Sequence, residues 1–325
     1  MSKNTVHKQE KYDLREEAKE FPMMIVLSFV YVCNAKCPNC PYNNSDIRSQ
    51  YKDATVMPED IFIRIADECG PYGAYLRLSG GGEPMLHPQA VELMLYAKTK
   101  GAKIGLITNG SKFTEQSLTE LIRAGIDVIE FSVDAADKET YAWVRPGLDW
   151  ERLNRNVRLA REIREREGRV TKIIASVINQ KGVDVRAAEE YWSKVVDKVQ
   201  VRKYLTWGYN EDKSADATPY LPPEDRVPCP WLFERLNVDS RGDVTLCGED
   251  IGFNERFANV MERSIKEIWN GPEFEYFRKK HLSGKGHEIA ICSQCPDWQY
   301  RSWQYNYWKI LRDAEKARGK EESRK

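Results

Sequence analysis

Three cysteines near the amino-terminal end have a spacing that suits metal chemistry. Cys33, Cys37 and Cys40 form a C-x3-C-x2-C motif directly after an apolar run. Three thiolates on a four-iron cluster leave one iron without a protein ligand, and that iron can bind a small molecule. A zinc site completed by a fourth ligand elsewhere in the chain is the alternative for this spacing.

A glycine-rich segment, SGGGEP at residues 79–84, follows the next apolar run. Consecutive glycines let the backbone approach a ligand closely. Glu83 adds an acceptor for a cationic amine. Because this loop lies one β/α unit after the cysteines, and both motifs fall at strand ends, the pair favours a bound cofactor over a zinc site.

Together these motifs resemble the radical S-adenosylmethionine (SAM) superfamily, over roughly residues 22–205. The resemblance implies a partial (β/α)6 barrel in which Cys33, Cys37 and Cys40 hold a [4Fe–4S] cluster. The amino and carboxylate groups of SAM would chelate the open iron. Reductive cleavage of SAM would then give a 5′-deoxyadenosyl radical that takes hydrogen from a substrate. The resemblance also implies a flavodoxin- or ferredoxin-type electron donor.

The same resemblance assigns SAM contacts. Glu83, with Gly81 and Gly82, matches the loop that holds the methionine amine, and a turn after the third strand supplies Thr108 and Asn109. Further expected contacts, taken residue by residue, are Tyr42, Ser132, Asp134, Arg145 and Asn179. The family often has an aromatic residue just before the third cysteine, where this chain has Asn39, so Tyr42 is offered as its substitute. For Arg145 a surface salt bridge is an equally supported interpretation.

Four more cysteines follow the barrel segment: Cys229, Cys247, Cys292 and Cys295. Four thiolates suit either an all-cysteine zinc site or a fully ligated second [4Fe–4S] cluster. Beside the first motif, their layout resembles the auxiliary-cluster extensions called SPASM and twitch domains. SPASM domains usually carry two auxiliary clusters, whereas four cysteines complete only one. We therefore expect the shorter twitch type.

The segment around Cys247, which reads CGED, resembles radical SAM aminocyclitol dehydrogenases and aminoglycoside epimerases of antibiotic biosynthesis. The resemblance implies hydrogen abstraction from a carbinol carbon and transfer of a second electron to the auxiliary cluster, which converts an alcohol to a ketone. An epimerase needs a hydrogen donor as well. The one cysteine left over, Cys69, lies on the apolar stripe of a predicted helix, where a structural thiol is expected. We therefore favour oxidation of a sugar- or aminocyclitol-like substrate, with epimerisation as the alternative.

Two further hypotheses come from other functional classes. A peptide- or protein-modifying maturase is the second, although such enzymes often have an amino-terminal leader-binding domain and only the polar residues 1–21 precede the first strand here. A zinc-stabilised binding protein on an α/β scaffold is the third.

Candidate substrate contacts lie at the end of the sixth predicted strand and just after Cys247. Arg202, Lys203 and Trp207 lie where a barrel of this kind binds substrate, although edge-strand residues are often only solvated. Glu249 and Asp250 adjoin Cys247 and could accept the alcohol proton or orient the ligand loop.

Alternating strands and helices must position these residues. We expect strands over 24–31, 75–79, 103–108, 128–133, 172–179 and 199–205, and helices over 58–69, 88–100, 115–124, 150–167 and 185–196. Six β/α units in series predict a parallel, right-handed sheet with its ligands at the carboxyl ends of the strands. The fold class is therefore α/β.

Beyond residue 205 the pattern changes. A β-hairpin over 233–238 and 243–247 and a helix over 264–281 are expected. The predicted organisation is a polar extension (1–21), a barrel (22–208), a linker (209–228), an auxiliary-cluster domain (229–300) and a carboxy-terminal helix or tail (301–325).

Composition narrows the functional classes. Lys plus Arg and Asp plus Glu number 50 each, so the net charge of zero gives no electrostatic case for nucleic acid. The most apolar stretch, 22–32, is too short to cross a membrane, and the amino terminus has no apolar signal core. A cytoplasmic protein is expected, in which eight cysteines are poor candidates for disulfides and better ones for metal ligands.

Overall fold

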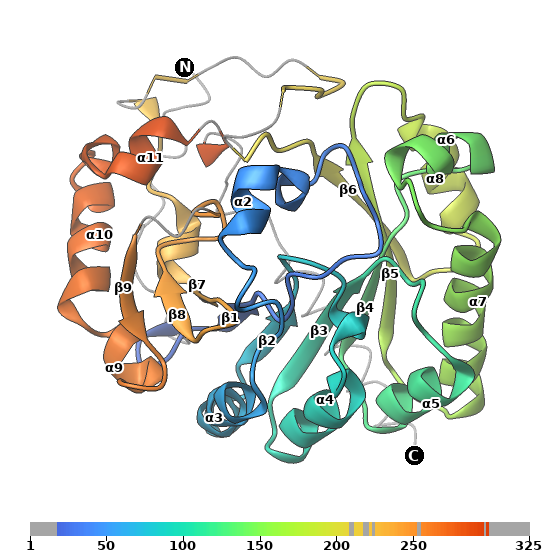
Figure 1. Ribbon diagram of the computed structural model, residues 1–325, viewed down its shortest axis with the longest axis horizontal. Coiled ribbons are helices and arrows are strands. Elements are labelled where there is room, and N and C mark those ends of the chain that lie inside the picture. The colour runs from blue at the N-terminus through green and yellow to red at the C-terminus, as the bar shows by residue number, and fades with distance from the viewer. Residues whose placement is uncertain are drawn as a thin grey trace, which may run out of the picture.

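The computed structural model of the chain describes residues 18–207, 211–216, 221–222, 225–251, 255–295 and 297–298 (Figure 1). These described parts contain one nine-stranded sheet in the order β6-β5-β4-β3-β2-β1-β7-β8-β9. The strands are Met24–Leu27 (β1), Tyr75–Leu78 (β2), Lys103–Thr108 (β3), Val128–Ser132 (β4), Lys172–Asn179 (β5), Lys198–Lys203 (β6), Arg235–Val238 (β7), Asp243–Thr245 (β8) and Arg256–Asn259 (β9).

The first six strands pair in parallel and in chain order, which confirms the predicted α/β partial barrel. Strand β1 is shorter than predicted and ends at Leu27. Beyond it Val30 makes only isolated bridges, to Val56 and to Gly81. The chain therefore leaves the sheet early and enters the cysteine loop, which the apolar character of residues 28–31 concealed.

The long helices that alternate with the barrel strands lie outside them (Figure 1). The α-helices are Ser45–Ser49 (α2), Glu59–Cys69 (α3), Ala90–Thr99 (α4), Glu115–Arg123 (α5), Lys138–Val144 (α6), Trp150–Arg166 (α7), Val185–Trp192 (α8), Ile265–Trp269 (α9), Pro272–Leu282 (α10) and Ala290–Gln294 (α11). Short 3-10 helices are Pro41–Asn43 (η2), Gly70–Tyr72 (η3), Pro84–Leu86 (η4), Pro230–Phe233 (η6) and Gly286–Glu288 (η7).

Acidic and hydroxyl residues fix where several of these helices begin. Thr114 caps α5 in a reciprocal pair with Ser117, and Asp149 accepts a hydrogen bond from the backbone N–H of Arg152 at the start of α7. The unpredicted helix α6 also starts at an N-cap, because Asp137 accepts from the backbone N–H of Thr140. Such caps satisfy backbone donors that have no partner within the helix.

The predicted hairpin is present, but it belongs to the barrel sheet. Strand β7 pairs in parallel with β1 and antiparallel with β8, and an unpredicted strand, β9, follows. Asn237 of β7 lies opposite Val26 of β1 and Thr245 of β8. The segment that carries Cys247 is therefore joined to the barrel through a continuous hydrogen-bonded sheet.

The helix predicted over 264–281 is two helices, α9 and α10. Pro272 disfavours helical geometry at the preceding Gly271 and is itself suited to the first turn of a new helix. The carboxy-terminal tail predicted over 301–325, and most of the amino-terminal extension, lie outside the described residues.

Inside the barrel, a small apolar layer closes the end opposite the cysteine loop. Met24, Tyr75, Val128 and Ile174 are buried together there, at the first or early positions of their strands. On three of these strands the next inward position is polar, at Arg77, Glu130 and Ser176, and these side chains line the cavity that begins beyond the apolar layer. None of the described helices has the length and apolar character needed to cross a membrane.

Candidate functional site

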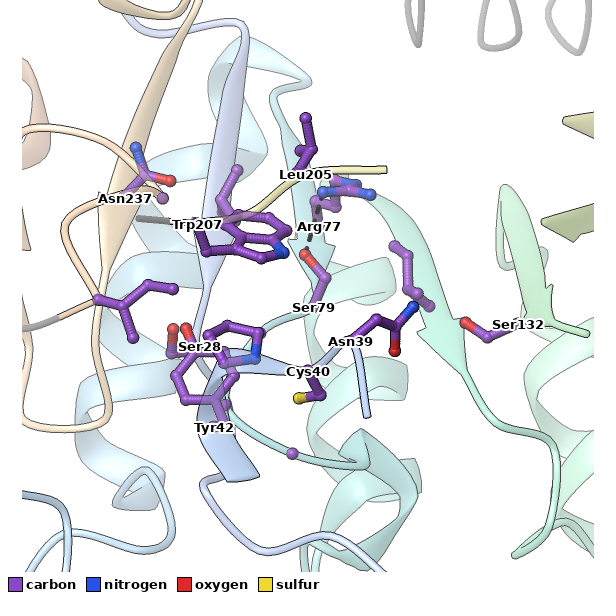
Figure 2. A pocket seen from close by; sticks show the side chains of 18 of the residues that line it. Ser28, Asn39, Cys40, Tyr42, Arg77, Ser79, Ser132, Leu205, Trp207 and Asn237 are labelled. Carbon is purple, nitrogen blue, oxygen red and sulfur yellow. Dashed lines mark hydrogen bonds between the residues drawn. The ribbon is translucent and has the colours of Figure 1, made fainter. Parts of the chain in front are cut away.

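A cavity of about 490 Å³ opens beyond the carboxyl ends of the barrel strands (Figure 2). Its wall includes Cys33, Cys37 and Cys40 and also Cys247. The first cysteine motif and one member of the second cysteine group therefore border the same space. This is the end of a parallel barrel at which ligands are expected.

Short-range hydrogen bonds shape the loop of the first three cysteines. The backbone N–H of Cys40 donates to the carbonyl of Cys37, and the Asn43 amide donates to the same carbonyl at 2.8 Å. The Sγ of Cys33 accepts from the backbone N–H of Ala35 at 3.4 Å. Burial raises the pKa of Cys40 to about 12 and raises that of Cys33 as well, so metal binding must displace these thiol protons.

The loop fits a cluster with three protein ligands. All eight cysteines are free thiols. In the described residues, no three Cys, His, Asp or Glu side chains gather around a point that would hold one metal ion. Thiolates that bind a four-iron cluster each ligate a different iron, and Cys33, Cys37 and Cys40 all line the same cavity.

Glu83 connects the glycine-rich loop to the turn after β3. Its buried carboxylate accepts hydrogen bonds from the Thr108 hydroxyl at 2.6 Å, the Asn109 backbone N–H at 2.7 Å and the Met85 backbone N–H at 3.2 Å. Burial raises the pKa of Glu83, although these donors favour the ionised form. The Asn109 amide also donates to Asn34 Oδ1 in the cysteine loop at 3.0 Å, so three predicted SAM contacts form one connected unit.

Two glycines of this loop, Gly81 and Gly82, are required because the backbone packs closely against them. A Cβ atom on Gly81 would lie 2.3 Å from the carbonyl oxygen of Val30, and one on Gly82 would lie 2.1 Å from that of Val32. The sequence suggested that these glycines let a ligand approach closely. The structure adds a different reason, since they let the loop pack directly on the cysteine loop.

Arg145 and Asp134 form a buried ion pair, with 2.5 Å between Nη2 and Oδ2 and side chains that are 14% and 1% exposed. Asp134 has a left-handed backbone with φ of 51° and also accepts from the backbone N–H of Ile178. Arg145 lines the cavity and donates from Nη1 to Cys37 Sγ at 3.5 Å. Within the described part of the chain, its buried Nε has no hydrogen-bond partner. The alternative of a surface salt bridge is wrong, because the pair is internal.

The other predicted contacts divide into two groups. Most of them line the cavity: Tyr42, Gly81, Gly82, Thr108, Asn109, Ser132, Arg202, Lys203, Trp207 and Asp250. The cavity wall does not include Asp134, Asn179 or Glu249. The Asn179 amide instead donates to the carboxylate of Asp216 at 2.7 Å.

Neighbouring side chains hydrogen-bond to the backbone of two cysteines in the second group. The backbone N–H of Cys229 donates to Nδ1 of His281 at 3.2 Å, and the Arg226 guanidinium donates to the carbonyl of Cys295 at 3.0 Å. Burial lowers the pKa of His281 to about 4, so the ring is neutral at physiological pH. Cys292 lies in α11. The leftover Cys69 is fully buried in α3, as its position on an apolar stripe predicts.

Sequence reasoning missed a set of polar residues on the floor of the cavity: Arg77, Glu130, Ser176 and Asn237. Glu130 is paired with Arg202, with 2.5 Å between Oε1 and Nη2. Burial tends to raise the pKa of Glu130, but the positive charges of Arg202 and Arg77 outweigh it and lower the pKa. The signal was present, because charged residues interrupt the apolar strands VIEFS and YLRL.

Comparison with protein families matches two regions of the chain. The radical SAM superfamily matches residues 27–181, and the iron–sulfur cluster-binding domain called SPASM matches residues 229–296. The SPASM match covers all four cysteines of the second group. It confirms an auxiliary-cluster extension of the SPASM or twitch kind, and the shorter twitch type stays a prediction that rests on the cysteine count.

Relatives of known function align along most of the chain. A PqqA peptide cyclase from Xanthomonas euvesicatoria is 28% identical over 320 residues, covering 85% of this chain and 82% of the cyclase. A tungsten-containing aldehyde ferredoxin oxidoreductase cofactor-modifying protein from Pyrococcus furiosus is 23% identical over 309 residues, covering 81% and 84%.

Solved structures share the fold at lower identity. Streptococcus suis SuiB bound to the precursor peptide SuiA superposes with a TM-score of 0.66 at 16% identity, covering 80% of this chain and 67% of SuiB. BtrN in complex with AdoMet and 2-DOIA superposes with a TM-score of 0.54 at 19% identity, covering 84% and 92%. At these identities the likeness concerns the fold alone.

Proposed function

We propose that this chain, which combines a radical SAM domain with a SPASM iron–sulfur domain, modifies a peptide or protein by radical chemistry. The two domains imply SAM and two [4Fe–4S] clusters as cofactors. The observation that carries the proposal is the shared cavity, which is bordered by the first three cysteines and by Cys247. A substrate held there lies between the two proposed cluster sites.

Cys33, Cys37 and Cys40 are the proposed ligands of the SAM-binding cluster, and Cys229, Cys247, Cys292 and Cys295 those of the auxiliary cluster. When bound, these groups supply a 5′-deoxyadenosyl radical for hydrogen abstraction and an acceptor for a second electron. A flavodoxin- or ferredoxin-type protein is the proposed electron donor.

The residues around the first cysteines suit the two ends of an amino acid. Glu83 accepts three hydrogen bonds, and since a carboxylate has about four lone-pair sites, one is left for the methionine amine of SAM. The unpaired Nε of Arg145 is a donor for the methionine carboxylate. Asp134 then acts through Arg145, which it orients and keeps charged.

Two relatives support a peptide or protein as the substrate. The PqqA peptide cyclase aligns across both domains at 28% identity, and SuiB, which has the same fold, was solved with its precursor peptide. This reading takes the place of the sugar dehydrogenase first inferred from the CGED segment, since peptide-modifying proteins occur among the relatives that match the chain.

Oxidation of a small alcohol is the second candidate, favoured by one observation. Asp250 is buried, lines the cavity and follows Cys247 by three residues. A carboxylate there can accept the proton that an alcohol loses as it becomes a ketone. The two candidates place the substrate in the same cavity and differ only in what it is.

A competition between substrate classes tests the proposal. Reconstituted protein with SAM and dithionite is offered a pool of blocked decapeptides, a pool of methyl glycosides and aminocyclitols, or neither. The proposal expects peptides to stimulate 5′-deoxyadenosine formation and to change mass in the same incubation. Stimulation and ketone formation with the sugar pool alone would replace it with alcohol oxidation.

A further inference from the structure

Asn237, on β7, has a buried amide that lacks hydrogen-bond partners. The residue is 5% exposed and lines the cavity (Figure 2), and neither its Nδ2 nor its Oδ1 has a hydrogen-bond partner among the residues that the structure describes. Buried polar groups in native proteins are nearly always paired, so an orphaned amide requires an explanation.

The position of Asn237 links the barrel to the segment of Cys247. It lies opposite Val26 on β1, which in turn lies opposite Arg77 on β2, so the three belong to one level of the sheet. On its other side it faces Thr245, two residues before Cys247. A Cβ atom added to Gly248 would lie 3.6 Å from Oδ1 of Asn237, so the glycine leaves the space beside the amide open.

A purely structural role does not account for this residue. Asparagine is depleted in strands, and the adjacent residues Leu236 and Val238 point to the opposite face of the sheet, so the amide of Asn237 does not belong to the apolar face of β7. An apolar residue would fill the site without an unpaired amide. Glu130, on the same cavity floor, also has one buried oxygen, Oε2, that accepts no hydrogen bond from any described residue. The cavity floor thus offers a ligand one hydrogen-bond donor, Nδ2 of Asn237, and two acceptors, Oδ1 of Asn237 and Oε2 of Glu130.

We propose that Asn237 binds the substrate by pairing with the backbone N–H and C=O of one extended residue. Those two groups point in the same direction from an extended peptide, as they do between paired residues of neighbouring antiparallel strands. A carboxamide complements them, with Oδ1 accepting and Nδ2 donating. The inference rests on the proposed function and names the part of a peptide that the cavity recognises.

The substitution Asn237→Leu tests the assignment because leucine has nearly the same volume and no polar atoms. In substrate-free protein it removes an unpaired buried amide, so the melting temperature should stay constant or rise, with iron content unchanged. Affinity for those blocked decapeptides that bind the wild type should fall about 10- to 100-fold, because two peptide groups are buried without partners.

Asn154→Leu is the matched control. Asn154 is also buried, but its amide donates to the carbonyl of Trp150 and accepts from the Tyr191 hydroxyl, and the cavity wall does not include it. The control should lower the melting temperature and leave peptide affinity unchanged. A fall in melting temperature for Asn237→Leu, with unchanged peptide affinity, would show a structural role and overturn the inference.

An ester scan of the tightest-binding decapeptide locates the contact. Replacing one backbone N–H by an ester oxygen should weaken binding to the wild type at a single position and leave binding to the Asn237→Leu variant unaffected there. If the wild type binds peptides and the losses of affinity caused by the ester and by Asn237→Leu simply add, the inference fails and the proposed function stands. If the wild type binds only glycosides, the proposed function fails and the inference falls with it.

Discussion

The carboxylate of Glu83 accepts a hydrogen bond from the backbone N–H of Asn109 at 2.7 Å. This bond joins the glycine-rich loop after β2 to the turn after β3. Through the Asn109 amide the connection continues to Asn34 in the cysteine loop. Three loops that are far apart in sequence therefore hold one another in place, and a change at Glu83 reaches all of them.

Glu83→Gln should lower the free energy of unfolding by about 1–3 kcal/mol, because a buried donor loses its acceptor when one carboxylate oxygen becomes an amino group. SAM binding should weaken at the same time. Urea unfolding followed by circular dichroism and equilibrium dialysis with SAM measure the two effects. Glu92→Gln, on the exposed side of α4, is the control and should change neither. Wild-type values for Glu83→Gln in both measurements would contradict this description of the loops.

Arg145→Met should lower the free energy of unfolding of the SAM-free protein by about 3–5 kcal/mol, because it leaves the Asp134 carboxylate buried without its cation. Adding Asp134→Asn should recover part of that loss, since the double variant no longer buries a charge. Denaturant titrations of the two single variants and the double variant measure the coupling. A double variant whose losses simply add would show that the pair is not coupled.

Asp239, which follows β7, predicts a pH dependence of stability. Its carboxylate is 1% exposed, and burial raises its pKa to about 6, against the lowering effect of the hydrogen bond from the Asp243 backbone N–H. In an unfolded chain, the pKa of an aspartate carboxyl is about 3.9. The folded state therefore binds this proton more tightly, and the associated stability is complete below about pH 4 and is lost as the pH rises through about 6.

Asp239→Asn removes that buried charge and keeps an acceptor for the turn. The difference in melting temperature, variant minus wild type, should therefore be larger at pH 8 than at pH 5. Differential scanning fluorimetry at the two pH values measures it, and Glu189→Gln, an exposed change on α8, should give the same difference at both. A difference for Asp239→Asn that is independent of pH would mean that the carboxyl is not perturbed in the folded protein.

Most of the barrel could be predicted because its signals are local. Strands β3 and β5 were predicted with the bounds that the structure has, since each is an apolar, β-branched run between clear turn residues. The pairing of β7 with β1 could not be predicted. It joins residues more than two hundred positions apart, and no local pattern records which strand edge a hairpin will occupy.

The residues of the candidate site that belong to sequence motifs could be predicted. The residues whose position depends on the pairing of distant strands could not. The residues of the first two motifs, which include Cys33, Cys37, Cys40 and Glu83, line the cavity, and so does Asn109, as the motifs indicated. Asn237 was missed because its inward direction depends on the register of β7 against β1. The role predicted for Asn179 stays a prediction, since its amide is bound by Asp216, a residue that no motif connects to it.

Counting iron tests the central claim, that two separate cysteine groups each hold a four-iron cluster beside one cavity. Anaerobically reconstituted wild type should carry about eight irons per chain, and the Cys33→Ala/Cys37→Ala/Cys40→Ala variant about four. Cys69→Ala, which changes a thiol buried in α3, is the control and should keep about eight. A triple variant without iron, or with zinc in its place, would contradict the claim, because the second cysteine group would then hold no cluster.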